Sequence, residues 1–252
     1  MNDNETKVNS AQRLINILSA AINVQDHNQQ ARTAWAEVFG IENPRTESGL
    51  LSVISRLVAL KKVFAEVEEA LRRIPNINEE LFIAPVSRLA NVASINSLTD
   101  SFSGYTRHLS QADMTALKFS EHQLSQYPEF NESQVPSKDL KDILIEVDNL
   151  IERILGSSLP EELRTSLLEL LHEVRKGVLE YRIRGAVALR DTLTKSLGIL
   201  AANKEDVEEN KESDEVQSLG RMLVRIDKAY TFALKMKPML EAAANILPRL
   251  LT

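Results

Sequence analysis

The stretch LEYRIRGAVALRD, residues 179–191, decides how the C-terminal half of this chain folds. It lies within residues 160–202, a run of helix-favouring residues that no proline interrupts after Pro160. Apolar residues recur there at three- and four-residue steps, which is typical of a helix with one buried face. We therefore predict one helix of roughly 60 Å at 1.5 Å per residue. Such a length favours a long hairpin or an extended bundle.

The three arginines of this stretch take different positions on a helical wheel of 100° per residue. Arg182 falls near the middle of the apolar arc, whereas Arg184 and Arg190 face the polar side. Because an unpaired buried charge is costly, we expect Arg182 to be buried and bonded to a carboxylate of another helix. Asp148 and Asp227 both flank apolar stripes and are the leading partners.

Two neighbours of Arg182 complete this candidate site. Gly185 faces the apolar side of the wheel, where its lack of a side chain would let another helix approach. The alternative to a structural ion pair is a binding groove, in which Arg182 and Tyr181 meet an anionic ligand. Both kinds of site contain buried charges, so the pattern leaves the two interpretations open.

The remainder of the chain is also predicted to be helical. Apolar stripes at helical spacing cover residues 50–74, 140–154 and 216–234, and Ser110 with Asp113 resembles a capping box. Sustained alternation typical of strands is missing. The predicted fold is all-α, an elongated helical bundle with a long helical hairpin in its C-terminal half. We expect helical regions at 1–126 and 138–252, joined by a proline-containing linker at 127–137.

Charge and composition limit the classes of partner. The net charge is −6, and most of it lies in the acidic segment 203–215, which we expect to form a loop between two helices. The rest of the chain is close to neutral, so we do not expect nucleic-acid binding. Cysteine is absent, and the first residues lack the basic and apolar segments of a signal peptide. We therefore expect a cytoplasmic protein.

No motif of a known chemistry stands out. Phosphate-binding glycine loops and nucleophile elbows are missing, and the four histidines are scattered. A di-iron bundle needs a pair of Glu-x-x-His motifs, and only Glu169 with His172 matches. We predict no catalytic, cofactor-binding or metal-binding residues, and we expect no cofactor. An enzyme of a different type stays open as a less favoured alternative.

The C-terminal segment is apolar and carries a few basic residues, so it is a candidate for contact with a partner or a membrane. Packing on the bundle or contact with a second subunit is the favoured interpretation, because ordinary core helices have the same pattern. The candidate contact residues are Met236, Met239, Leu240, Ile246, Leu247 and Leu250.

One block resembles known sequences. LLHEVR at 170–175, followed by YRIRGA at 181–186, is similar to a segment of bacterial all-helical proteins that share a Tyr-x-x-Arg-Gly-Ala block and have no assigned activity. The likeness covers residues 140–200. It implies a bacterial origin and an accessory or mobile-element setting, with phage defence as one role.

These observations favour a non-enzymatic helical protein that works through protein contact, with a protein partner or as a homo-oligomer. The alternative is a membrane-active effector, pore-forming or membrane-binding, that uses its C-terminal amphipathic helices.

Overall fold

The computed structural model describes residues 7–235 and 238–240. Within these residues the fold is all-α, with eleven α-helices, two short 3-10 helices and two strands of two residues each. The chain forms two compact units, which divide between Asn131 and Glu132. This division falls inside the predicted linker, residues 127–137.

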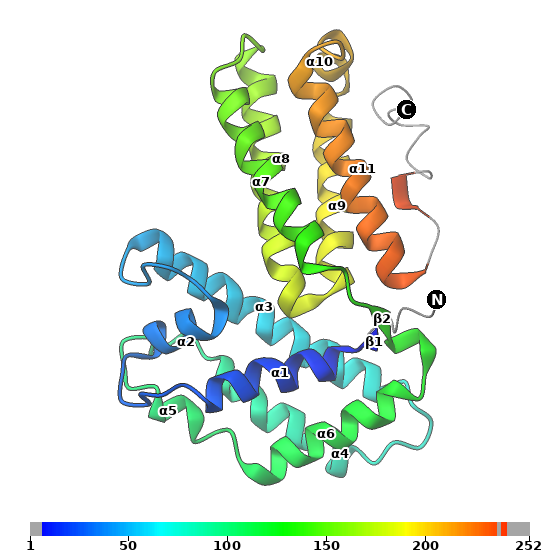
Figure 1. The fold of residues 1–252 in the computed structure, drawn as a ribbon. Helices are drawn as coiled ribbons and strands as arrows, with labels where there is room; N and C mark the ends of the chain where they lie inside the picture. The colour runs from blue at the N-terminus through cyan, green and yellow to red at the C-terminus, as the bar shows by residue number, and fades with distance from the viewer. Residues whose placement is uncertain (1–6, 236–237, 241–252) are drawn as a thin grey trace. The chain divides into compact units, whose positions relative to one another are not determined.

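The N-terminal unit is built around the 26-residue helix α3. Helices α1, α3, α4 and α6 pack in sequence order, and α6 returns to contact α1 (Figure 1). Its elements are β1 (Lys7–Val8), α1 (Ser10–Ile22), α2 (Ala31–Phe39), α3 (Glu47–Arg72), α4 (Glu79–Leu89), η1 (Ala90–Ala93), α5 (Ser103–Thr106), α6 (Gln111–Ser125) and η2 (Pro128–Phe130).

Aromatic residues fill one part of this unit. Trp35 on α2 stacks on Phe39, and Phe102 meets the Trp35 ring edge-on at a centroid distance of 5.5 Å. Trp35 and Phe102 are completely buried. The aromatic contacts therefore fix α2 and the segment that leads into α5 to the same core.

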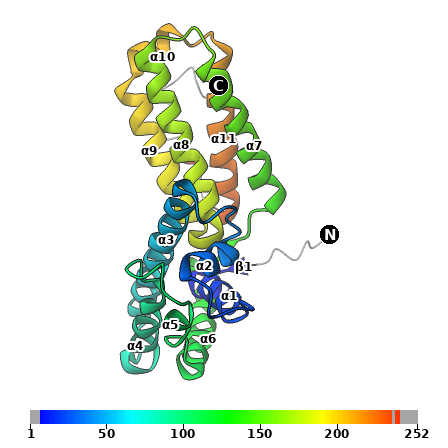
Figure 2. The ribbon, with the colours of Figure 1, turned by 90° about the vertical axis from the view of Figure 1, so that its left-hand side faces the viewer.

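The C-terminal unit is an up-down-up-down four-helix bundle (Figures 1 and 2). Helix α7 packs on α8, α8 on α9, α9 on α11, and α11 closes the ring against α7. Its elements are β2 (Glu132–Ser133), α7 (Ser137–Leu155), α8 (Glu161–Arg184), α9 (Ala186–Ala202), α10 (Lys204–Glu209) and α11 (Asp214–Leu234). This half contains a long helical hairpin, α8 and α9, whose turn lies inside residues 160–202 rather than at the acidic segment where it was expected.

The predicted apolar stripes form the core of this bundle. Ile143, Val147, Leu150 and Ile154 of α7 are buried at three- and four-residue spacing. The other helices add further aliphatic residues, and Met222 and Tyr230 of α11 lie in the same cluster. Burial of this cluster holds the four helices together.

The prediction of one unbroken helix over residues 160–202 is wrong, because the chain reverses at Gly185. This glycine has φ 61° and ψ −146°, a backbone conformation that residues with a Cβ atom rarely adopt. Helix α8 ends at Arg184 and α9 begins at Ala186, so the reversal needs only this one residue. Gly185 is therefore the turn of the hairpin rather than a contact point for another helix.

The close contact between α8 and α9 lies at a different glycine. A Cβ atom on Gly177 would lie 1.7 Å from Thr192 Oγ1 and 3.3 Å from the Ala188 carbonyl oxygen. The Thr192 hydroxyl donates to that carbonyl at 3.0 Å, which holds it against α8. The two helices can pack at this spacing only because residue 177 has no side chain.

We predict that Gly177→Ala lowers the free energy of unfolding by about 1–3 kcal/mol, because the added methyl overpacks the contact with Thr192. Chemical denaturation monitored by circular dichroism measures this change. Gly198→Ala is the matched control, since its Cβ would meet no atom within 4 Å. That control should be neutral or stabilise the helix by about 0.5–1 kcal/mol. Equal effects of the two variants would contradict the prediction.

The acidic segment is not a simple loop, which corrects the expectation for residues 203–215. Residues Lys204–Glu209 form helix α10, and Val207 is 1 % exposed in the bundle core. Only a short turn then separates α10 from α11, whose N-terminus is capped by the Ser213 side chain. A single apolar residue thus anchors an otherwise charged segment to the bundle.

The capping box expected at Ser110 is present, and it is joined to a neighbouring helix. The Ser110 Oγ accepts from the Asp113 backbone N–H at 3.0 Å and donates to the Asp113 carboxylate at 2.8 Å. Arg88 of α4 donates to the same carboxylate at 3.0 Å. The hydrogen bond from Arg88 holds the pKa of Asp113 below its usual value, against the opposing effect of burial.

Because its pKa is lowered on folding, Asp113 stabilises the fold above the unfolded pKa of about 3.9. This contribution is lost as the pH falls through the lower folded value.

We predict that Arg88→Gln raises the pKa of Asp113, measured by NMR titration. We also predict that Arg88→Gln reduces stability at pH 7 but not at acidic pH. Arg72→Gln is the control, since it removes only an exposed ion pair with Glu68; an unchanged Asp113 titration in Arg88→Gln would disprove the assignment.

Candidate functional site

The structure reverses the roles expected for the arginines near Gly185. Arg182 is exposed, and Arg184 is 7 % exposed. Arg184 follows Gly177 by seven residues, two turns of helix, so it lies on the face of α8 that α9 covers. Arg182 lies on another face. The prediction that Arg182 is buried is therefore wrong, because a wheel drawn through residues 160–200 averaged two antiparallel helices into one.

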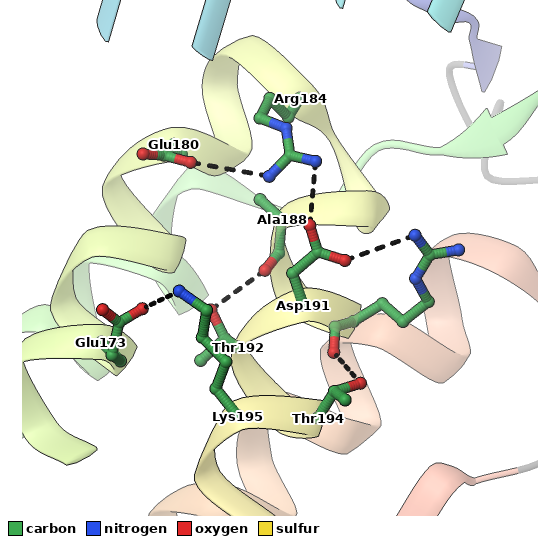
Figure 3. A network of polar contacts seen from close by, with 9 residues as sticks. Glu173, Glu180, Arg184, Ala188, Asp191, Thr192, Thr194 and Lys195 are labelled. Carbon is green, nitrogen blue, oxygen red and sulfur yellow. Dashed lines mark hydrogen bonds and ion pairs between the residues drawn. The ribbon is translucent and has the colours of Figure 1, made fainter. Parts of the chain in front are cut away.

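Arg184 lies at the centre of a polar network at the α8–α9 turn (Figure 3). Its guanidinium donates to the Asp191 carboxylate at 2.9 Å and lies 3.7 Å from the Glu180 carboxylate. The side chains of Arg184 and Glu180 are each 8 % exposed, whereas that of Asp191 is 39 % exposed. The exposed Arg190 contacts the second oxygen of Asp191 at 3.3 Å.

A second ion pair joins the same two helices further from the turn. The Lys195 ammonium on α9 donates to the Glu173 carboxylate on α8 at 2.7 Å (Figure 3). The Lys195 side chain is 53 % exposed, so this pair contributes little stability compared with the Arg184 network. Together the two sets of contacts fix the register of α8 against α9.

The other members of the predicted arginine site have separate structural contacts. Asp148 pairs with Arg175 at 3.1 Å on the surface. The Tyr181 hydroxyl accepts from the Val135 N–H at 2.8 Å. Asp227 is buried and accepts from the Met239 and Leu240 N–H groups at 2.8 and 3.1 Å. Arg182 is therefore not brought together with Asp148 or Asp227.

The burial of three charged residues of this region, Glu132, Glu180 and Arg184, was not expected from the sequence. Glu180 and Arg184 lie on a helix face that appears polar until the chain reversal is known. Glu132 is 7 % exposed, and its carboxylate accepts from the Ala186 N–H at 2.9 Å, at the start of α9. This places a negative charge at a helix N-terminus, which is favourable. Only the Glu180–Arg184 spacing of four residues indicated a pair in advance.

The structure describes part of the apolar C-terminal segment. Met239 and Leu240 pack against the bundle core, and Leu240 is 5 % exposed. The other candidate contact residues lie outside the described residues: Met236, Ile246, Leu247 and Leu250.

A groove of about 410 Å³ lies between α7 and α11, on the outside of the bundle. Leu150 and Ser218 are the buried residues of its lining, and Ile145, with 61 % of its surface exposed, borders it. The remaining lining residues are polar or charged: Asp142, Glu146, Asn149, Arg153 and Arg221.

Two ion pairs that involve lining residues connect α7 to α11. Glu146 pairs with Arg225, and Arg153 lies 3.7 Å from the Glu215 carboxylate. Arg153 and Arg221 both donate to the Ser218 hydroxyl, at 3.3 and 2.9 Å. These contacts hold the charged side chains of the groove in place, whereas the Ile145 side chain is largely exposed to solvent. Among the lining residues that the structure describes, Ile145 is the one apolar side chain that is largely exposed.

No group of three or more His, Asp or Glu side chains in residues 7–235 and 238–240 is placed to hold a metal ion. Within the same residues, every helix is too short or too polar to cross a bilayer.

Comparison with known proteins finds no matching family model, no similar curated protein and no similar solved structure.

We predict that Arg184→Met lowers the free energy of unfolding by about 3–5 kcal/mol, because it removes the cation beside the buried Glu180 carboxylate. Arg182→Met is the matched control two residues away on the exposed face, and it should change stability by less than about 0.5 kcal/mol. Urea denaturation of both variants measures the difference. A larger loss for Arg182→Met would restore the original assignment.

Proposed function

We propose that this protein is a non-enzymatic helical interaction component that assembles with a protein partner through the α7–α11 face of its C-terminal bundle. The observation that carries the proposal is the exposed Ile145 beside a groove with charges of both signs. Apolar area at the centre of such a face supplies affinity, and the surrounding charges select and orient the partner.

Two further observations favour this proposal. Ion pairs join α7 to α11 and orient Glu146 and Arg153 before a partner arrives, which reduces the side-chain freedom lost on binding. Met239 and Leu240 contribute to the bundle core. That packing favours an interaction role over a membrane-active role for the segment that contains them.

The resemblance of residues 140–200 suggests a biological setting for the proposal. It is similar to bacterial helical proteins, and an accessory role in a defence or mobile-element system fits a component that acts by assembly. On this proposal the partner is a protein of the same system or a second copy of the chain.

The test compares two apolar-to-acidic variants on the same helix. Ile145→Asp alters the groove, whereas Leu155→Asp alters a side chain that is 60 % exposed and outside the groove lining. Sedimentation velocity of the pure protein and quantitative co-purification from the host measure association with itself and with host proteins. We expect Ile145→Asp to weaken the specific complex at least about tenfold, because a charge replaces an apolar anchor.

We expect Leu155→Asp to behave like the wild-type protein. Circular dichroism confirms that both variants are folded. The proposal is wrong if the wild-type protein forms no complex with itself or with a host protein. It is also wrong if both variants lose the complex equally.

A further inference from the structure

The charges of the α7–α11 groove lie on both sides of one ion pair between the two helices. Glu146 of the α7 lining pairs with Arg225 of α11, and this pair is the reference point. Asp142 lies one turn before Glu146, and Arg221 lies one turn before Arg225. Because α7 and α11 are antiparallel, a step back of one turn along α7 and a step back of one turn along α11 lead to opposite ends of the groove. Asp142 and Arg221 therefore lie about 6 Å on either side of the central pair.

This arrangement gives the groove an acidic end and a basic end. Asp142 marks the acidic end, while Arg221 and Arg153, the latter paired with Glu215, mark the basic end. Among the described residues, Asp142 and Arg221 have no ion-pair partner, although Arg221 donates to Ser218. Both charges are thus available to a molecule that lies along the groove.

We propose that the occupant of this face is a second copy of the chain, related by a two-fold axis that crosses the groove at the level of the Glu146–Arg225 pair. This inference rests on the proposed function. Rotation about such an axis reverses the direction of the groove, so the acidic end of each copy meets the basic end of the other. In a two-fold interface each contact occurs twice, and the Asp142–Arg221 contact is therefore formed in both directions.

The apolar residues fit the same axis. Ile145 is one residue from the central pair, so the two Ile145 side chains meet close to the axis. Phe232 follows Arg221 by eleven residues, about three turns, and lies on the same face of α11 with 41 % of its surface exposed. Each Phe232 then lies toward the basic end of the other copy, where an arginine can cover its ring.

The dimensions of the face suit a small interface. Helix α7 has 19 residues, which corresponds to about 28 Å, and a pair of packed helices is about 20 Å wide. The resulting area of roughly 560 Å² per partner is below the value of about 800 Å² in stable complexes and lies in the range of weak, transient ones. Two apolar anchors and reciprocal charge contacts are appropriate for a reversible dimer.

The experiment uses charge reversal in the full-length protein, measured by sedimentation velocity at low salt over a range of concentrations. Asp142→Arg and Arg221→Asp each place like charges in both symmetric contacts. We expect each variant alone to dimerise at least about tenfold more weakly than the wild-type protein. Mixed together, the two variants place opposite charges in both contacts, so we expect them to form a heterodimer. The double variant Asp142→Arg/Arg221→Asp should dimerise like the wild-type protein for the same reason.

Two surface variants on α8 control for the change in net charge. Glu169→Arg and Lys176→Asp alter exposed residues outside the groove lining and should leave the dimer unchanged. The inference is overturned if the wild-type protein stays monomeric at about 100 µM, far above the Kd of specific complexes. It is also overturned if the mixed variants show no more association than each alone.

The outcomes separate this inference from the proposed function. A monomeric protein that captures a host protein in an Ile145-dependent way overturns the two-fold dimer and leaves the interaction role standing. Dimerisation that survives Ile145→Asp and both charge reversals places the contact elsewhere and overturns both proposals for this face.

Discussion

The close approach of α8 and α9 is the constraint on which the C-terminal bundle depends. At Gly177 there is no room for a side chain, and at Gly185 the backbone takes a conformation that excludes one. These two glycines act together, because the turn at Gly185 sets which residues of α9 lie opposite α8, and Gly177 lets them touch. The Arg184 and Lys195 ion pairs lie on either side of this contact and reinforce the register that it sets. A shift of one residue would rotate both sets of charges away from their partners.

The helical content of the chain could be predicted from sequence, because the apolar stripes are local and each helix buries one face. Gly156 and Pro160 are local end signals, and each lies at a helix boundary in the structure. The turn at Gly185 lacked such a signal. Glycine occurs both inside helices and at reversals, and the residues on both sides of Gly185 favour helix. Which of the two it adopts depends on whether α9 has a partner to fold back on, which is a property of the whole bundle.

The error at Arg182 followed from that turn. A helical wheel assumes one axis, and residues beyond Gly185 belong to a second helix with the opposite direction. Asp227 shows a different limit of sequence reasoning. It lies beside a buried apolar stripe, as the sequence indicated. Its carboxylate, however, accepts hydrogen bonds from the Met239 and Leu240 N–H groups. The order of side chains in a sequence does not show which backbone N–H groups a carboxylate will meet. The groove beside Ile145 could not be predicted from the sequence either, because it forms where α7 and α11, the first and last helices of the bundle, meet.

That meeting of first and last helices has a consequence for how the bundle forms. The α8–α9 hairpin joins residues that are close in sequence, whereas Glu146 and Arg225 are separated by 79 residues. Closing so long a loop costs more conformational entropy than forming a hairpin, so we expect the α7–α11 contact to form late in folding. The groove then exists only on chains that have completed their fold. A partner that recognises it distinguishes finished molecules from intermediates, and its binding energy adds directly to the stability of the native state.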